Sequence, residues 1–204
     1  MKELDAKITL TKFLIAAVII IGLFVSYSIA KPAIIETYER ATRDTHLTGE
    51  VFTAKDLSVT VQPIRLFYDK WDASSGYDGD FVNEGYHFKH GIGWYIPSKT
   101  IANGSTGSTQ LGLWLGGEFN EVYFNACTDT EWTASYDGGT YRIICYVNGN
   151  IVHDTGFNDY TYSEEIKLDV SGANDLIIEL QEYKGSQGTL NVILGEFEVN
   201  KLSE

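Results

Sequence analysis

The sequence predicts an all-β domain, a sandwich or barrel of antiparallel strands, preceded by one N-terminal transmembrane helix. Short apolar runs separated by turn residues follow one another from Gly49 onward without helical periodicity, which is typical of these folds. Asn148-Gly149 separates two such runs and is the strongest short hairpin signal, because both turn residues tolerate a positive φ. One uncharged run, Phe13 to Ala30, lies ahead of this region. We therefore expect a membrane-targeting segment followed by one sandwich domain at residues 49–204.

The first element is this uncharged run. Residues 12–30 are predicted to form a transmembrane helix, a signal anchor, behind a short tail at residues 1–11. Its uncharged residues, at about 1.5 Å each, would span roughly 27 Å, close to the ~30 Å core of a bilayer. A cleaved secretory signal is the alternative, because lysines precede the run and Ser28-Ile29-Ala30 is an acceptable cleavage site. The first interpretation gives a single-pass membrane protein with an extracellular sandwich, and the second gives a secreted protein.

The next element is a juxtamembrane stalk at residues 31–48, where Ala33 to Arg43 combines helix formers with alternating charge. The pattern then changes to short β-like runs. A polar, glycine-rich segment, Trp71 to Asn83, is predicted to be a loop outside the core. The predicted strands are Val51-Phe52, Leu57–Val61, Ile64–Tyr68, Tyr95-Ile96, Leu111–Leu115, Glu121–Cys127, Tyr141–Val147, Ile151–His153, Ile166–Val170, Leu176–Leu180 and Leu190–Val199.

The charge and the motifs exclude several functional classes. The 204-residue chain carries a net charge of −13, so it should repel nucleic acid and anionic lipid headgroups. The sequence has no Gly-x-Ser-x-Gly elbow and no phosphate-binding loop. Glu118 and Glu121 flank a strand start, but carboxylate pairs of this kind arise by chance in an acidic chain. We therefore expect a protein that is not an enzyme and does not bind nucleic acid.

The only two cysteines, Cys127 and Cys145, allow one disulfide outside the cytosol. The apolar alternation around them places them on opposite strand faces, which makes a bond geometrically difficult. The alternative is a pair of small buried hydrophobic residues.

The strongest metal candidate is a group of loop aspartates that could offer oxygen ligands to Ca²⁺: Asp69, Asp72, Asp78 and Asp80. Loop aspartates usually stabilise turns, which is the alternative. His87 and His90 are three positions apart, but a metal site needs three or four ligands, so exposed loop histidines are favoured. Calcium is the only cofactor that the sequence suggests.

Four segments together resemble the novel putative carbohydrate-binding module (NPCBM) family over roughly residues 65–200. They are GIGWYIPSKTI at Gly91–Ile101, LGGEFNEVYFNACTDT at Leu115–Thr130, GTYRIICYVNGNIVHDTG at Gly139–Gly156 and IKLDVSGANDLIIEL at Ile166–Leu180. The resemblance implies a galactose-binding-like jelly roll, usually found in secreted or surface bacterial proteins and often appended to glycoside hydrolases.

The chain departs from the family pattern at two places. Trp94-Tyr95 stands where the family commonly has histidine and alanine, and Val192 to Glu196 stands where its last strand commonly carries Trp and Asp. The first departure places aromatic surface at a predicted loop position. Trp132 and Tyr136 flank another short polar run. We therefore predict Trp94, Tyr95, Trp132 and Tyr136 as ligand contacts, with rings that fill the ends of the sandwich as the alternative.

The function that these observations suggest is a membrane-anchored, extracellular, NPCBM-like carbohydrate-binding module without catalytic activity. Its partners would be a glycan or cell-surface polysaccharide and, through the N-terminal helix, the membrane. The alternative is a structural or assembly subunit of a surface complex, in which the sandwich binds other proteins.

Overall fold

The computed structural model describes residues 49–202, except residue 64 and residues 97–103, 133–139, 160 and 185–189. This part of the chain belongs to one compact unit, Gly49–Glu204. The predicted tail (1–11), transmembrane helix (12–30) and stalk (31–48) lie outside the described residues. Within the described ranges, no helix is both long enough and apolar enough to cross a membrane.

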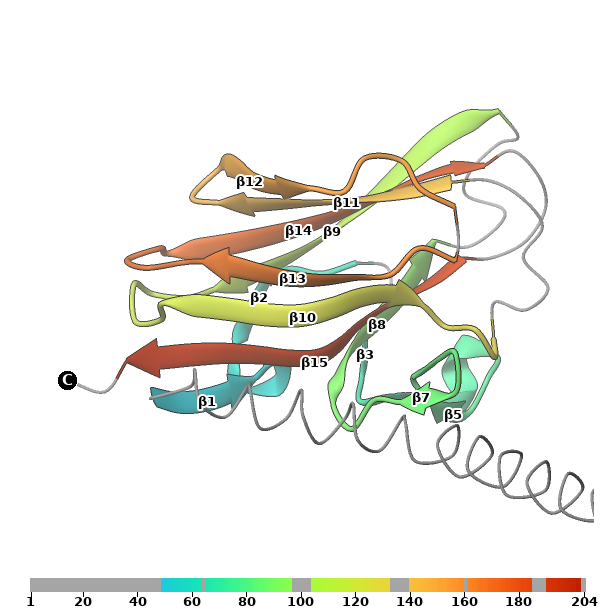
Figure 1. Cartoon of the computed structure of the whole chain (residues 1–204), viewed down its shortest axis with the longest axis horizontal. Helices are drawn as coiled ribbons and strands as arrows, with labels where there is room; N and C mark the ends of the chain where they lie inside the picture. Colours follow the sequence, from blue (N-terminus) through green and yellow to red (C-terminus); the bar gives the residue numbers. More distant parts are fainter. Residues whose placement is uncertain are drawn as a thin grey trace, which may run out of the picture. The chain divides into compact units, whose positions relative to one another are not determined.

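The described residues form two antiparallel sheets, which confirms the all-β antiparallel sandwich. The first sheet has the order β13-β10-β15-β8-β3, with β1 also paired to β15, and the second has the order β12-β11-β14-β9-β2. In Figure 1 the strands of the two sheets lie in two layers. The first sheet comprises β1 (Gly49–Thr53), β3 (Phe67–Tyr68), β8 (Gly91–Ile96), β10 (Glu121–Thr128), β13 (Glu164–Asp169) and β15 (Leu190–Leu202). The second comprises β2 (Ser58–Val61), β9 (Ser105–Trp114), β11 (Thr140–Val147), β12 (Asn150–Asp154) and β14 (Asp175–Lys184).

Shorter elements fill the connection between β3 and β8. Strand β4 (Lys70–Trp71) pairs with β5 (Gly79–Asp80), and β6 (Val82–Asn83) pairs with β7 (Tyr86–His87). The 3₁₀ helix η2 (Ala73–Ser75) lies between β4 and β5, and η1 (Ala54–Asp56) lies between β1 and β2. The segment that was predicted to be a loop outside the core, Trp71 to Asn83, therefore contains strands, and Trp71, Phe81 and Val82 are buried in it.

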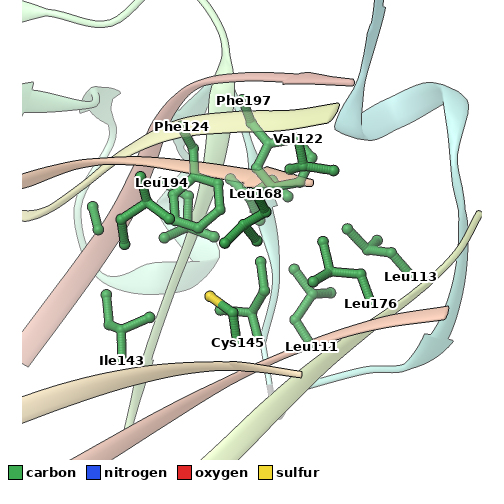
Figure 2. Packing of buried hydrophobic residues seen from close by; sticks show 14 of the residues in the cluster. Leu111, Leu113, Val122, Phe124, Ile143, Cys145, Leu168, Leu176, Leu194 and Phe197 are labelled. Atoms are coloured by element: carbon green, nitrogen blue, oxygen red, sulfur yellow. The ribbon is translucent and has the colours of Figure 1, made fainter. Parts of the chain in front are cut away.

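The core lies between the two sheets because alternate residues of each strand point inward. In β14 these are Leu176, Ile178 and Leu180, all fully buried. Figure 2 shows side chains of the two sheets packed against one another, including Leu111, Leu113, Ile143 and Cys145 from the second sheet and Val122, Phe124, Leu168, Leu194 and Phe197 from the first. Burying one such aliphatic or aromatic side chain contributes about 1.5–3 kcal/mol. Trp114 alternates with these inward residues and is 50% exposed on the outer face.

Strand β15 contains a β-bulge at Glu196. Its register with β10 slips so that Glu196 and Phe197 together face Phe124. Glu196 has a φ of 49°, a left-handed conformation that is uncommon for residues with side chains. Because of the extra residue, Leu194 and Phe197 both enter the core although they are three positions apart. Without the bulge, strict alternation would point Glu196 into the core and Phe197 out of it.

The hairpin between β11 and β12 has the predicted turn. Asn148 and Gly149 have φ values of 48° and 79°, and Val147 pairs with Asn150 across the turn. Positive φ at both central residues is the signature of a type I′ turn, whose twist matches that of the flanking strands. The Asn148 side chain also accepts a hydrogen bond from the backbone N–H of Asn174 at 2.9 Å, which ties the turn to the start of β14.

Replacing Gly149 by valine is expected to lower the free energy of unfolding by more than ~1 kcal/mol, because a β-branched residue resists a positive φ. A Cβ at this position would meet no atom within 4 Å, so the cost comes from the backbone and not from a clash. Gly149→Asn is the matched control, because asparagine tolerates the left-handed region. Chemical unfolding measures both variants, and an unchanged midpoint for valine would contradict the turn assignment.

The two cysteines are free and buried, so the predicted disulfide does not form. Cys145 lies in the core between the sheets, whereas Cys127 lies on the opposite face of its own sheet, in a separate cluster. The alternation around them indicated this difference in facing, and the alternative of two small buried hydrophobic residues is the correct one. Burial raises the pKa of the Cys145 thiol to about 12 and also raises that of Cys127, so both stay protonated at neutral pH.

Candidate functional site

A second hydrophobic cluster covers the outer face of the first sheet. Outward-facing Tyr95 of β8, Cys127 of β10 and Ile193 of β15 form its base. The β3–β8 connection packs over that base. The cluster, called here the aromatic cluster, consists of Phe67, Trp71, Phe81, Phe88, Tyr95, Cys127 and Ile193, with Tyr77 and Trp132 packed against it and partly buried.

Gly93 allows the connection to lie close to the sheet. A Cβ at Gly93 would stand 2.7 Å from the Trp71 ring and 2.8 Å from the Phe81 ring, closer than real Cβ contacts come. The rings of Trp71 and Phe81 meet edge to face, with centroids 4.8 Å apart. The absence of a side chain at Gly93 therefore leaves the space in which the two large rings pack over β8.

Tyr77 and Trp132 form the partly exposed edge of the aromatic cluster. Their rings stack at a centroid distance of 5.7 Å and an interplanar angle of 16°. Trp132 also meets Trp71 and Tyr95 edge to face, at 4.7 and 5.5 Å. The Tyr77 hydroxyl donates a hydrogen bond to the exposed Glu131 carboxylate at 3.0 Å. Partial burial, followed by this bond, raises the pKa of Tyr77, so the hydroxyl remains a donor at neutral pH.

Asp129 holds this edge in place. Its fully buried carboxylate accepts hydrogen bonds through Oδ2 from the Trp71 indole N–H at 2.7 Å and from the Val82 N–H at 3.2 Å. Through Oδ1 it accepts from the backbone N–H groups of Glu131 and Trp132 at 2.9 and 2.8 Å. A buried carboxylate needs such a set of donors to offset the loss of its hydration. Asp129 therefore fixes the backbone of Trp132 relative to the ring of Trp71.

The structure separates the four predicted ligand contacts. Trp94 points into the core between the sheets and is fully buried, so it has no surface to offer a ligand. The ring of Tyr95 belongs to the aromatic cluster and is 9% exposed. Trp132 lies at the exposed edge, and Tyr136 lies outside the described residues. Tyr77, which the prediction did not include, takes the place beside Trp132.

Three of the four predicted calcium ligands have separate local roles. Asp69 accepts a hydrogen bond from the Gly91 N–H and pairs with Lys55. Asp72 caps η2 by accepting from the Ser74 N–H at 2.8 Å, and Asp80 pairs with His87 at 3.0 Å. Asp78 is exposed. Within the described ranges these aspartates do not converge into a group with metal-binding spacing.

A group of ionisable side chains that the sequence analysis did not assemble does converge. His90 lies 3.1 Å from Glu196 through Nδ1 and Oε2, and 3.4 Å from Glu198 through Nε2 and Oε1. Interaction with the Glu198 carboxylate is the main cause that raises the pKa of His90; burial opposes the rise, and the charge of Glu196 adds to it. The sequence signal for this group is a break in the alternation of apolar residues along the strand. Leu194 and Phe197 are three positions apart instead of two or four, which marks the bulge at Glu196.

The chain matches no protein-family model and no curated protein. Its fold is similar to that of solved carbohydrate-binding modules. One is the CBM51-2 module with INT domains of ZmpB from Clostridium perfringens, in complex with GlcNAc, at a TM-score of 0.56 and 16% identity. That match covers 77% of this chain and 33% of the solved chain, so this chain spans about a third of its length.

Two further solved structures have the same fold. The tandem CBM51 modules of Sp3GH98, a family 98 glycoside hydrolase from Streptococcus pneumoniae, match at a TM-score of 0.56 and 14% identity, over 76% of this chain and 48% of theirs. CBM51 of GH95 from C. perfringens, in complex with methyl-galactose, matches at 0.51 and 15%, over 74% of this chain and 100% of that one. At these identities the likeness establishes the fold and not the ligand.

Proposed function

We propose that the sandwich is a carbohydrate-binding domain and that the Tyr77–Trp132 pair is its sugar contact. The observation that carries this proposal is the stacked, partly exposed ring pair with the carboxylate of Glu131 beside it. Aromatic rings offer flat apolar surface for the C–H faces of a sugar, and neighbouring polar groups bond its hydroxyls. Asp129 pre-organises the site, which lowers the entropic cost of binding.

The charge of the site indicates the class of glycan. Glu131 is exposed next to the ring pair, and the chain as a whole carries −13. A sulfated or uronic acid-rich polymer would be repelled, so the ligand is a neutral glycan. The similar folds support this class, because the ZmpB and GH95 modules were solved with GlcNAc and methyl-galactose, both uncharged sugars.

The domain binds its ligand without converting it. The proposed contact pairs two rings with one carboxylate, whereas glycoside hydrolysis needs two opposed carboxylates. In this proposal residues 12–30 anchor the domain to the membrane and hold it outside the cell, and cleavage of that segment would instead release it.

Replacing Tyr77 by alanine is expected to weaken binding of the full chain to the sugar at least tenfold, roughly 1.4 kcal/mol, because one of the two stacking faces is lost. Calorimetric titration with GlcNAc and with methyl-galactose measures the affinity. The melting temperature should stay near that of the unmodified protein, since Tyr77 lies at the edge of the aromatic cluster.

Trp114→Ala is the matched control, because it removes an exposed ring from the other sheet. It should leave sugar affinity unchanged. If Trp114→Ala lost sugar binding and Tyr77→Ala kept it, the binding site would lie on the second sheet instead. The proposed function would be contradicted if the unmodified chain bound neither of these two sugars nor any glycan of a wider array.

One observation favours the alternative of an assembly subunit. The registers of the second sheet place Ile151, Tyr146, Ile177, Gly112 and Val61 in one row across its strands, next to Trp114. Ile151 and Val61 in this row are among the exposed large hydrophobic residues. Exposed apolar surface of this kind often marks a protein interface. The Trp114→Ala control therefore also tests this alternative, by loss of a co-purifying protein partner with sugar binding retained.

A further inference from the structure

We propose that His90, Glu196 and Glu198 form a binding site for a divalent metal ion of the zinc class. One ring nitrogen and one oxygen from each carboxylate all lie within 4.8 Å of one another. Ligands around a tetrahedral zinc ion, at bond lengths of about 2.0–2.1 Å, are separated by roughly 3.3 Å. The Nε2 to Glu198 Oε1 distance of 3.4 Å has this value, whereas Glu196 Oε2 lies beside the other ring nitrogen, Nδ1, at 3.1 Å and must turn toward Nε2 to join the ion. This site is independent of the glycan proposal and shares no residue with it.

The backbone brings the three residues together before any ion binds. The bulge turns Glu196 away from the core and onto the same side as Glu198, two positions along β15. The Glu196 N–H donates to the carbonyl of His90 at 2.8 Å, which fixes the two segments against each other. At the next residue, a Cβ on Gly91 would stand 2.6 Å from the Leu194 carbonyl oxygen. The close approach of β8 to β15 therefore needs glycine there.

A non-glycine residue in the left-handed region is strained and persists only where its surroundings impose it. Such residues cluster at functional sites. Glycine is the ordinary residue at this position of a bulge, so the use of glutamate here places a carboxylate where a strain-free sequence would have none. Coordination of an ion by that carboxylate would offset the strain.

Second contacts orient the Glu196 carboxylate, as outer-shell groups do in metal sites. Its Oε1 accepts hydrogen bonds from the Tyr86 hydroxyl at 3.0 Å and from the Lys89 N–H at 3.5 Å. Its Oε2 lies 3.1 Å from His90 Nδ1. The ring of Phe88 packs on Gly195, and Tyr86 meets Phe88 edge to face at 4.9 Å. The segment that carries these groups is thus held against β15.

The ring nitrogen that faces Glu198, Nε2, is the His90 atom that would bind the ion. His90 Nε2 is shielded from solvent and faces the Glu198 carboxylate at 3.4 Å. His90 is itself 26% exposed, so an ion can reach the group from solvent, and water can complete the coordination. The charges also balance, because two carboxylates and a neutral imidazole together neutralise a divalent cation.

The ligand set selects against calcium. Calcium takes six to eight oxygen ligands, whereas the two carboxylates of this group supply at most four oxygens. An imidazole with two carboxylates suits zinc and its first-row neighbours, which accept nitrogen at low coordination number.

The test uses the full chain after treatment with a chelator. Zinc at about a hundred times its dissociation constant should raise the melting temperature by roughly 5–10 °C, and calcium at the same concentration should not. Titration should give one strong zinc site per chain. Glu198→Gln and His90→Gln should both abolish the strong site. His87→Gln is the matched control, because His87 also pairs with a carboxylate but is exposed and stands outside the group; it should bind zinc normally.

A second measurement uses only the unmodified protein, so its result does not depend on whether a variant folds. In NMR spectra of the unmodified protein, zinc should shift the ring signals of His90 and leave those of His87 and His153 in place. The proposal is overturned if the His90 signals do not move, if His90→Gln keeps the strong site, or if calcium stabilises the protein as well as zinc does.

Discussion

Replacing Trp94 by alanine is expected to destabilise the domain by about 3–5 kcal/mol, the usual cost of removing a large buried ring. Trp94 is fully buried in the core between the sheets, on a strand that pairs with β15. The cavity cannot collapse easily, because strands of both sheets hold the surrounding side chains. For a domain of this size the melting temperature should fall by roughly 6–20 °C. Thermal unfolding followed by circular dichroism measures the change.

Trp114→Ala provides the comparison for the same substitution on the surface. Its ring is 50% exposed, so the change should stay within about 0.5 kcal/mol of the unmodified protein. If Trp94→Ala melted normally and lost sugar binding instead, Trp94 would be a ligand contact and the burial described above would be incorrect. The pair of variants therefore separates the two interpretations that the sequence left open for this residue.

Replacing Asp129 by asparagine is expected to cost about 2–4 kcal/mol, although the two side chains have nearly the same shape. Both oxygens of the carboxylate accept from N–H donors: Oδ1 from Glu131 and Trp132, and Oδ2 from Trp71 and Val82. In asparagine an NH₂ group replaces one of these oxygens. This NH₂ is itself a donor and cannot accept hydrogen bonds from the N–H groups that face it. The change also releases the backbone of Trp132, so sugar affinity should fall along with stability.

Asp169→Asn is the matched control for this change. Asp169 is exposed and accepts from the Ser171 N–H at 3.0 Å and from the Ser171 hydroxyl. Its replacement should change the free energy of unfolding by only a few tenths of a kcal/mol, because water can satisfy the N–H. Urea unfolding of the two variants measures the difference. Equal midpoints would show that the buried carboxylate is not the element that holds Trp132 in place.

The elements that the sequence predicted correctly are those with a local cause. Leu111 and Leu113 alternate with outward residues because a strand has a period of two, and the Asn148-Gly149 turn is set by φ preferences of its own residues. The burial of Trp71 could not be predicted in this way. Its neighbours in sequence are polar, and what buries it is the outer face of a sheet built largely from later parts of the chain.

The candidate sites depend on contacts between distant segments. Trp132 was identified from its composition, but its partner Tyr77 was hidden in a segment that looked like an ordinary loop. His90 was interpreted as an exposed loop histidine because a metal site needs three or four ligands, and its two carboxylate neighbours lie on β15, more than a hundred residues later in the chain. The bulge that brings them to His90 was nevertheless visible, since Leu194 and Phe197 break the alternation of the strand.

Strand β15 pairs with β1, β8 and β10, and it is the last of the described strands to leave the ribosome. Until residues 190–202 emerge, β8 and β10 each lack a neighbour on one side, and the nascent chain exposes two open strand edges together with the apolar faces of both sheets. Synthesis and folding are thus separated in time. The domain cannot close until residues 190–202 have been made, and until then its open strand edges and apolar faces favour aggregation.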